Sequence, residues 1–267
     1  MAHSFQHLLI IGCGNMGGAM LDGWLAAGEP SSRFAVLDPA LGAVPDGVAL
    51  YRDAAEVPGT HDAVLLGFKP QQLGLVGPGL QSVTAGKTLC SLLAGITLAQ
   101  LAAAFPLCAA RLRVMPNLAA RIGKSPVILA EAGLDAAGRA AALALFDRLG
   151  TAMWLADEAK FDLVTALAGS GPGFVYRFID ALAGAAVDLG LEPDTAARLA
   201  LATVEGAAML AAVSDVPPAV LADRVASPGG MTREGLNVLD EGGALRRLLT
   251  ETLRATAHKG AALSRGA

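Results

Sequence analysis

The chain has 267 residues, a formal net charge of −4 and a pI of about 5.6. It contains no run of Lys and Arg that could neutralise several phosphates, which argues against a nucleic-acid partner. Cys13, Cys90 and Cys108 are isolated and lack metal-ligand spacing, so neither a disulfide framework nor a metal site is predicted. Residues 1–6 do not resemble a secretory signal, and we expect a cytoplasmic protein.

The mean hydropathy of +0.51 raises the question of a membrane span, because residues 88–110 contain no charge. Gly95, Gln100 and Pro106 interrupt this stretch. It divides into a strand-like run and a short Ala-rich helix, as buried elements of an α/β protein do. We therefore expect two buried elements and no contact with a membrane.

Short apolar runs alternate with helical patterns through residues 1–157. The runs are Leu8–Ile11, Phe34–Leu37, Ala63–Phe68, Thr88–Ala94, Arg111–Met115, Val127–Ala130 and Met153–Leu155. This alternation predicts an α/β domain of the Rossmann type, with a doubly wound, largely parallel sheet.

Strand patterns disappear in residues 158–267, and helical patterns take their place. The predicted helices are Phe161–Leu189, Pro193–Val213, Pro217–Val225 and Ala244–Leu263. Their Ala-rich faces carry few large apolar groups and often need a partner to complete their burial. The second half is therefore predicted to be an all-α domain that forms a homodimer or a higher homo-oligomer.

A glycine-rich turn follows the first apolar run directly and opens an amphipathic helix. In the pattern Gly-x-Gly-x-x-Gly, Gly12 permits the tight turn, Gly14 lets the backbone approach a pyrophosphate, and Gly17 permits close packing of helix on strand. The helix N-terminus offers free N–H groups to the anion. This context predicts a dinucleotide site, to which Asn15 and Met16 of the same turn also belong.

Asp38 ends the second run, about 20 residues after the last glycine, where a carboxylate bonds the ribose 2′-hydroxyl of NAD and repels a 2′-phosphate. No Arg or Lys follows it directly, so NADH is favoured over NADPH. A solvent-facing capping Asp is the alternative interpretation.

Five segments carry more specific patterns. They are Gly14-Asn15-Met16-Gly17, Gly67-Phe68-Lys69-Pro70-Gln71, Arg113-Val114-Met115-Pro116-Asn117, Ala168-Gly169-Ser170-Gly171-Pro172-Gly173-Phe174-Val175-Tyr176 and Ala226-Ser227-Pro228-Gly229-Gly230-Met231-Thr232. In these segments, and in their order over essentially the whole chain, the sequence resembles the pyrroline-5-carboxylate reductases.

The resemblance implies reduction of the cyclic imine 1-pyrroline-5-carboxylate to L-proline with NADH or NADPH, in oligomers built on the helical domain. It places Lys69, Pro70 and Asn117 beside the nicotinamide ribose and Ser170 at the border of the active site. A surface lysine at position 69, and a helix kink at Ser170, are the alternatives.

The turn from Ser227 through Gly229 and Gly230 to Met231 and Thr232 opens a helix. Its N–H groups at a positive helix end suit the substrate carboxylate. Thr232 is the predicted catalytic residue, bonding the ring nitrogen or the carboxylate, and the resemblance implicates the same residue. The alternative is that Thr232 only caps the helix.

The chain departs from the family pattern at three places. Leu118 and Ala119 replace the usual Thr-Pro, Met231 replaces a smaller residue or Thr, and an Asn near the adenosine is absent around Asp53. These departures concern cofactor preference and substrate breadth. The rival functions are a β-hydroxyacid dehydrogenase-like oxidoreductase, for which the interdomain helix lacks a lysine, and a dinucleotide-sensing protein without catalysis.

Overall fold

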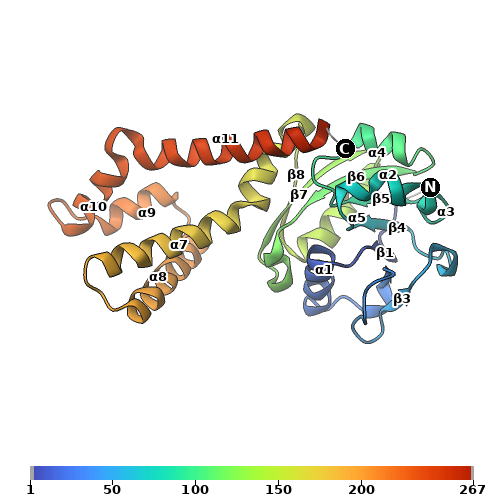
Figure 1. Cartoon of the computed structure of the whole chain (residues 1–267), viewed down its shortest axis with the longest axis horizontal. Helices are drawn as coiled ribbons and strands as arrows, with labels where there is room; N and C mark the ends of the chain where they lie inside the picture. The colour runs from blue at the N-terminus through green and yellow to red at the C-terminus, as the bar shows by residue number, and fades with distance from the viewer. Residues whose placement is uncertain (1–2, 266–267) are drawn as a thin grey trace. The chain divides into compact units, whose positions relative to one another are not determined.

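A computed structural model describes residues 3–265 (Figure 1), with the side chains beyond Ala262 left aside. Two compact units make up the chain. The first holds the residues up to Gly169 and those from Thr256 onward, and the second holds Ser170–Ala255. The boundary after residue 157 inferred from the sequence stays a prediction, and residues 266–267 of that predicted domain lie outside the described range.

The first unit is built on an eight-stranded sheet with the order β3-β2-β1-β4-β5-β6-β7-β8. All neighbours pair in parallel except β6 and β7. The strands are β1 (Leu8–Ile11), β2 (Phe34–Leu37), β3 (Ala49–Tyr51), β4 (Ala63–Leu66), β5 (Thr88–Ser91), β6 (Ala110–Met115), β7 (Ser125–Ala132) and β8 (Gly150–Trp154). The predicted doubly wound, largely parallel sheet is confirmed, and β3 is an additional strand.

Five helices of the first unit lie between strands, and a sixth follows β8. They are α1 (Asn15–Ala26), α2 (Leu73–Val76), α3 (Gln81–Thr84), α4 (Leu98–Ala104), α5 (Ala136–Asp147) and α6 (Phe161–Val164). The uncharged stretch 88–110 forms β5, α4 and the start of β6, so the interpretation of this stretch as buried α/β elements is confirmed.

The core lies on both faces of the sheet, because successive side chains of a strand point to opposite faces. Leu8 and Ile10 join one buried cluster, and Leu9 and Ile11 join the other. On the first face Trp24 of α1 stacks on Phe34 at 5.2 Å between ring centroids, and its indole N–H donates to the Leu145 carbonyl at 2.9 Å. This packing fixes α1, and with it the glycine-rich turn, against β1 and α5.

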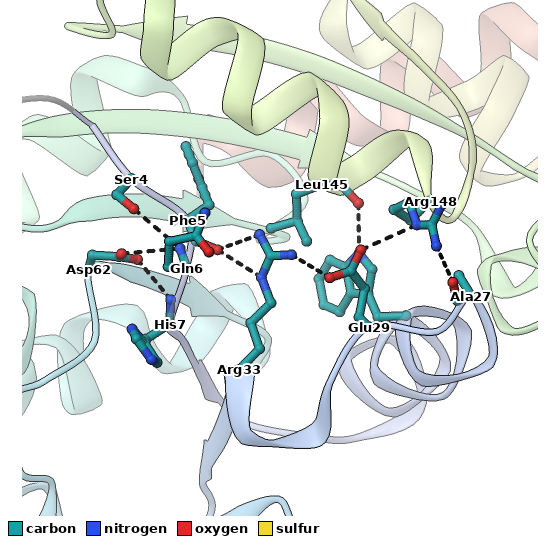
Figure 2. A network of polar contacts seen from close by, with 11 residues as sticks. Ser4, Phe5, Gln6, His7, Ala27, Glu29, Arg33, Asp62, Leu145 and Arg148 are labelled. Atoms are coloured by element: carbon teal, nitrogen blue, oxygen red, sulfur yellow. Dashed lines mark hydrogen bonds and ion pairs between the residues drawn. The ribbon is translucent and has the colours of Figure 1, made fainter.

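A polar network ties the chain before β1 to the end of α1 (Figure 2). Arg33 donates from Nε to the Phe5 carbonyl at 2.9 Å and also pairs with Glu29. Glu29 binds Arg148 as well, with 3.2 Å between Nε and Oε1, and Arg148 donates to the Ala27 carbonyl. Charge-assisted bonds of this kind hold the connection from α1 to β2 in place.

The predicted single helix 161–189 is wrong, because a π-helical turn, η7 (Thr165–Gly169), divides it. In a regular α-helix the Ala168 carbonyl would accept from the N–H four residues later. That residue is Pro172, which has no N–H. The carbonyl instead accepts the side-chain amide of Asn117 at 2.9 Å, which stabilises the irregular turn.

The second unit is entirely helical. It contains α7 (Gly171–Asp188), α8 (Pro193–Val213), α9 (Pro218–Val225), α10 (Met231–Asp240) and the first part of α11 (Ala244–Arg265), and α7 packs on α8. Large apolar side chains of α7 and α8 are exposed within the chain, among them Tyr176, Phe178, Leu201, Met209, Leu210 and Val213. Among the described residues, α8 alone has the length and apolar composition that would let a helix cross a bilayer.

Candidate active site

The glycine-rich turn is tightly packed at two of its glycines and open at the third. Gly12 has φ of +82°, and a Cβ at this position would lie 2.8 Å from the backbone nitrogen of Phe68. A Cβ on Gly17 would lie 2.9 Å from the Gly12 carbonyl oxygen, whereas one on Gly14 would meet nothing within 4 Å. Gly12 and Gly17 therefore serve close packing, and the space beside Gly14 is open.

Helix α1 begins immediately after this turn, with Gly14 as its N-cap residue and no side-chain cap. The first N–H groups of a helix have no intrahelical acceptor and lie at its positive end. The exposed residues Gly14 and Asn15 therefore present a surface suited to an anion.

A cavity of about 580 Å³ lies at the carboxyl ends of β1, β2 and β4. Ligands of doubly wound sheets bind at such a point, where strand order reverses on either side of β1. Four predicted cofactor residues line it, namely Gly12, Gly14, Asp38 and Lys69. Its volume lies within the range of cofactor and small-molecule sites.

Asp38 accepts backbone N–H groups of the neighbouring loops and also lines the cavity, while its predicted bond to a ribose hydroxyl stays a prediction. Its Oδ2 accepts the backbone N–H of Cys13 at 2.9 Å, and its Oδ1 accepts those of Ala40 and Leu41 at 2.9 and 3.2 Å. The carboxylate thus orders the turn after β2, and the same residue faces the cavity. With about four acceptor positions on a carboxylate, one remains for a ribose hydroxyl.

The remaining predicted cofactor residues Asn15, Met16, Gly17 and Pro70 are not among the residues that line the cavity. Gly17 is buried beneath the turn, as its packing role requires. Pro70 begins a short 3₁₀ turn directly after Lys69, which fixes the backbone at that residue.

Asn117 is also outside the lining of the cavity, and it is buried at the end of β6. Its Oδ1 accepts the Ala119 N–H and its Nδ2 donates to the Ala168 carbonyl, each at 2.9 Å. One N–H of its amide remains for another partner. Its primary contacts are structural.

Arg52, Asp53 and Gln72 also line the cavity, and sequence reasoning did not select them. Arg52 and Asp53 follow β3, a strand of only three residues in a region rich in Gly and Pro. A pattern search for alternating strands has little to detect in so short a run. The signal that would have found them is their position after the carboxyl end of a parallel strand.

The second candidate site lies in the second unit. Gly230 caps α10, and the backbone N–H of Gly230 donates to the Ser227 carbonyl at 2.9 Å. Thr232 is the second residue of the helix and is exposed, so the alternative that Thr232 caps the helix is wrong. Gly229 has φ of +69°, which favours glycine at this point of the turn.

The side chains of this turn are available to a ligand. Met231 is 94% exposed and Ser227 is also exposed. Among the described side chains and backbone groups, the Thr232 hydroxyl has no hydrogen-bond partner. The turn therefore offers two hydroxyls and the free N–H groups of a helix start, which are suited to a carboxylate.

The predicted active-site residue Ser170 precedes α7 and is half-buried, as its N-cap residue without a side-chain cap bond. His61 follows Thr60 and precedes Asp62 in a polar stretch of the sequence, where a surface histidine is expected, but this expectation is wrong. It is buried, and its Nε2 lies 2.7 Å from the Val83 carbonyl. Burial lowers its pKa, and the charge of Lys87 acts in the same direction. His61 is structural, since it does not line the cavity.

The fold and the cavity define a class of protein. A glycine-rich turn, an open helix start and a carboxylate at the end of the second strand, all at the switch point of a doubly wound sheet, characterise Rossmann oxidoreductases that bind nicotinamide dinucleotides.

Comparison with known proteins identifies the family. Residues 158–263 match the family model "Pyrroline-5-carboxylate reductase dimerisation". The chain is 34% identical to a pyrroline-5-carboxylate reductase of Pseudomonas aeruginosa, over 98% of each chain. Among solved structures, that of a pyrroline-5-carboxylate reductase from Coxiella burnetii is 28% identical with a TM-score of 0.90, over 98% of this chain and 99% of the other.

A Plasmodium falciparum pyrroline carboxylate reductase solved with NADP bound has the same fold. It is 24% identical with a TM-score of 0.83, and the match covers 99% of this chain and all of the other. The chain belongs to the pyrroline-5-carboxylate reductase family. It is an NAD(P)H-dependent oxidoreductase acting on an imine, and its helical domain is a homo-oligomerisation domain.

Proposed function

We propose that the protein reduces 1-pyrroline-5-carboxylate to L-proline, the last step of proline formation. The observation that carries this proposal is the cavity at the carboxyl ends of β1, β2 and β4, lined by Gly12, Gly14 and Asp38, in a chain that matches its relatives from end to end. The nicotinamide dinucleotide supplies the hydride when it is bound. The protein has to bind and orient the imine, because a protonated cyclic imine is itself a good hydride acceptor.

The turn from Ser227 to Thr232 is the proposed carboxylate site. The N–H groups at the start of α10 and the hydroxyl of Ser227 bind the carboxylate, with Gly229 and Gly230 providing the backbone shape. The free hydroxyl of Thr232 donates to the carboxylate or accepts from the protonated ring nitrogen. Met231, exposed on the same turn, limits the width of the ring that fits.

The other residue roles are proposed from the glycine-rich turn, from the lining of the cavity and from the family motifs. Gly12, Gly14, Asn15, Met16 and Gly17 form the turn that receives the pyrophosphate, and Lys69 lies at the nicotinamide end. Pro70 and Asn117 hold the backbone near that end, and Ser170 borders the active site. Residues 1–157 thereby form the dinucleotide-binding domain, and residues 158–267 the substrate-binding and dimerisation domain.

NADH is the proposed preferred cofactor. One acceptor position of Asp38 is left for a ribose hydroxyl, and the negative carboxylate disfavours a 2′-phosphate in the same cavity.

The protein is proposed to work as a homodimer or a larger homo-oligomer in the cytoplasm. The exposed apolar side chains of α7 and α8 support the homo-oligomer, since they remain open to water in a single chain. The three unpaired, buried cysteines are consistent with a reducing compartment.

The test is to follow oxidation of NADH and of NADPH by the purified protein with 1-pyrroline-5-carboxylate. The matched variants are Thr232→Ala and Thr232→Ser. Loss of one charge-assisted hydrogen bond predicts a fall in kcat/KM of about 10- to 150-fold for Thr232→Ala, and Thr232→Ser should retain most of the activity. The KM for the dinucleotide should not change.

Two results would contradict the proposal. Activity on 3-hydroxy acids without activity on the cyclic imine would favour the dehydrogenase alternative. Tight dinucleotide binding by the assembled protein, without turnover of any cyclic imine, would favour a sensor.

A further inference from the structure

Arg52 makes three hydrogen bonds to the backbone of the segment after β2. Its Nη1 donates to the carbonyls of Asp38, at 2.9 Å, and of Leu41, and its Nη2 donates to that of Gly42 at 3.4 Å. The planar guanidinium suits this arrangement, because its N–H groups point in fixed directions. One side chain thereby closes residues 38–42 into a defined loop.

The backbone of Arg52 is itself held in place. Its N–H donates to Glu56 Oε2 at 2.9 Å, and Glu56 is part of a capping box with Asp53. The residue before it, Tyr51, accepts the Asp38 N–H at 3.1 Å in the parallel pairing of β2 with β3. The backbone that carries the Arg52 guanidinium is therefore held in a fixed position.

The loop that Arg52 closes is one wall of the cavity. Asp38, Pro39 and Ala40 line the cavity together with Gly12 and Gly14, and Arg52 lines it as well. The loop is held from the other side by the Asp38 carboxylate, which accepts the N–H groups of Ala40 and Leu41. This wall is the adenosine end of the site, since Asp38 ends β2.

An arginine at this end of a Rossmann site can also be a ligand of an adenosine 2′-phosphate. Here both hydrogens of Nη1 are donated to carbonyls, and the negative Asp38 shares the cavity. These contacts indicate that Arg52 holds the shape of the cavity wall and does not bind a 2′-phosphate. A wall of this shape would contact NADH and NADPH alike.

We propose that Arg52 is a positioning residue that fixes residues 38–42 as the adenosine wall, so that it strengthens the binding of NADH and of NADPH by the same factor. The inference rests on the proposed function only in requiring that the cavity binds a nicotinamide dinucleotide. Two properties of the site then depend on different residues. Arg52 sets the affinity for the dinucleotide, and Asp38 sets the preference between NADH and NADPH.

The test measures the dissociation constants of NADH and NADPH by fluorescence titration of the full-length protein without imine substrate. The variants are Arg52→Ala, Arg52→Lys and Asp38→Asn, with Arg121→Ala as the control. Arg121 is 58% exposed and pairs with Asp22 outside the cavity.

Arg52→Ala is expected to raise the dissociation constants of NADH and of NADPH about tenfold each, so that their ratio stays unchanged. Arg52→Lys should recover little of this loss, because the donors of an ammonium share one atom and lack the fixed planar spacing with which Nη1 and Nη2 reach the three carbonyls. Asp38→Asn should move the ratio toward NADPH, and Arg121→Ala should change neither constant. In turnover, Arg52→Ala should raise the KM for the dinucleotide without changing kcat.

Three results would overturn the inference. A loss confined to NADPH would make Arg52 a ligand of the 2′-phosphate. Unchanged constants in Arg52→Ala would show that the wall does not depend on it. Failure of the wild-type protein to bind either dinucleotide would overturn both this inference and the proposed function. Normal dinucleotide binding without imine turnover would contradict only the proposed function and would leave this inference intact.

Discussion

The side-chain amide of Asn117 donates a 2.9 Å hydrogen bond to the carbonyl oxygen of Ala168, 51 residues further along the chain. This bond joins the end of β6 to the π-helical turn that precedes Ser170. It exists because Pro172 cannot supply the N–H that a regular helix would offer to the same carbonyl.

Replacing Asn117 by Ala leaves the Ala168 carbonyl without this partner. The free energy of unfolding should fall by about 1–3 kcal/mol, as measured by urea denaturation followed by circular dichroism. Imine turnover should fall as well, because the turn leads into the proposed active-site residue Ser170.

The matched control is the double variant Asn117→Ala with Pro172→Ala, in which residue 172 regains an N–H. If the carbonyl is the origin of the loss, the double variant should recover part of the stability of the single variant. Additive losses would contradict this explanation.

Arg113 and Glu158 form an ion pair in which the arginine is buried and the glutamate is partly exposed. Arg113 Nη1 lies 2.9 Å from Glu158 Oε1, and the Arg113 side chain is 5% exposed. The same oxygen accepts the Leu98 N–H at 2.8 Å, and the guanidinium lies 3.9 Å from the centroid of the Phe161 ring. Burial lowers the pKa of Arg113, and Glu158 opposes this change.

Glu158→Ala should therefore destabilise the protein by about 2–4 kcal/mol, because it leaves a buried cation without its partner. Asp22→Ala, which removes the partner of the exposed Arg121, should cost less than about 1 kcal/mol. Thermal unfolding of both variants checks the difference, and equal losses would show that burial of Arg113 is unimportant.

His61 predicts a dependence of stability on pH. Burial lowers its pKa below the ordinary value of 6.5, so the unfolded chain binds a proton more readily than the folded chain. Stability should rise with pH between the lowered pKa and about 6.5 and become independent of this group above that range. The difference in Tm between wild type and His61→Gln should be nearly constant above pH 7 and should change below it. A constant difference at all pH values would contradict the shift.

Cys13 lies within the glycine-rich turn, yet its thiol should be unreactive. Burial, and next the charge of Asp38, raises its pKa to about 11. At pH 8 only roughly 0.1% is thiolate. Alkylation by iodoacetamide should be slow at pH 8 and should accelerate steeply toward pH 11. Rapid labelling at pH 8 of a Cys90→Ala, Cys108→Ala variant would show that the thiol is accessible and acidic.

The sequence alone was sufficient for the sheet, the helical second half and the glycine-rich turn. These features are local, since apolar periodicity and the backbone freedom of glycine are properties of neighbouring residues. The family motifs were equally visible, because each is a short continuous segment.

Tertiary structure decided the features that depend on residues distant in the chain. The short strand β3 forms by pairing with β2, and this pairing brings Arg52 to the carbonyls of residues 38–42. The π-helical turn depends on Asn117, which no local pattern near Ala168 contains. His61 is likewise buried beside the Val83 carbonyl, 22 residues further along the chain. Hydrogen bonds between distant residues are not encoded in local periodicity, so only the folded chain reveals them.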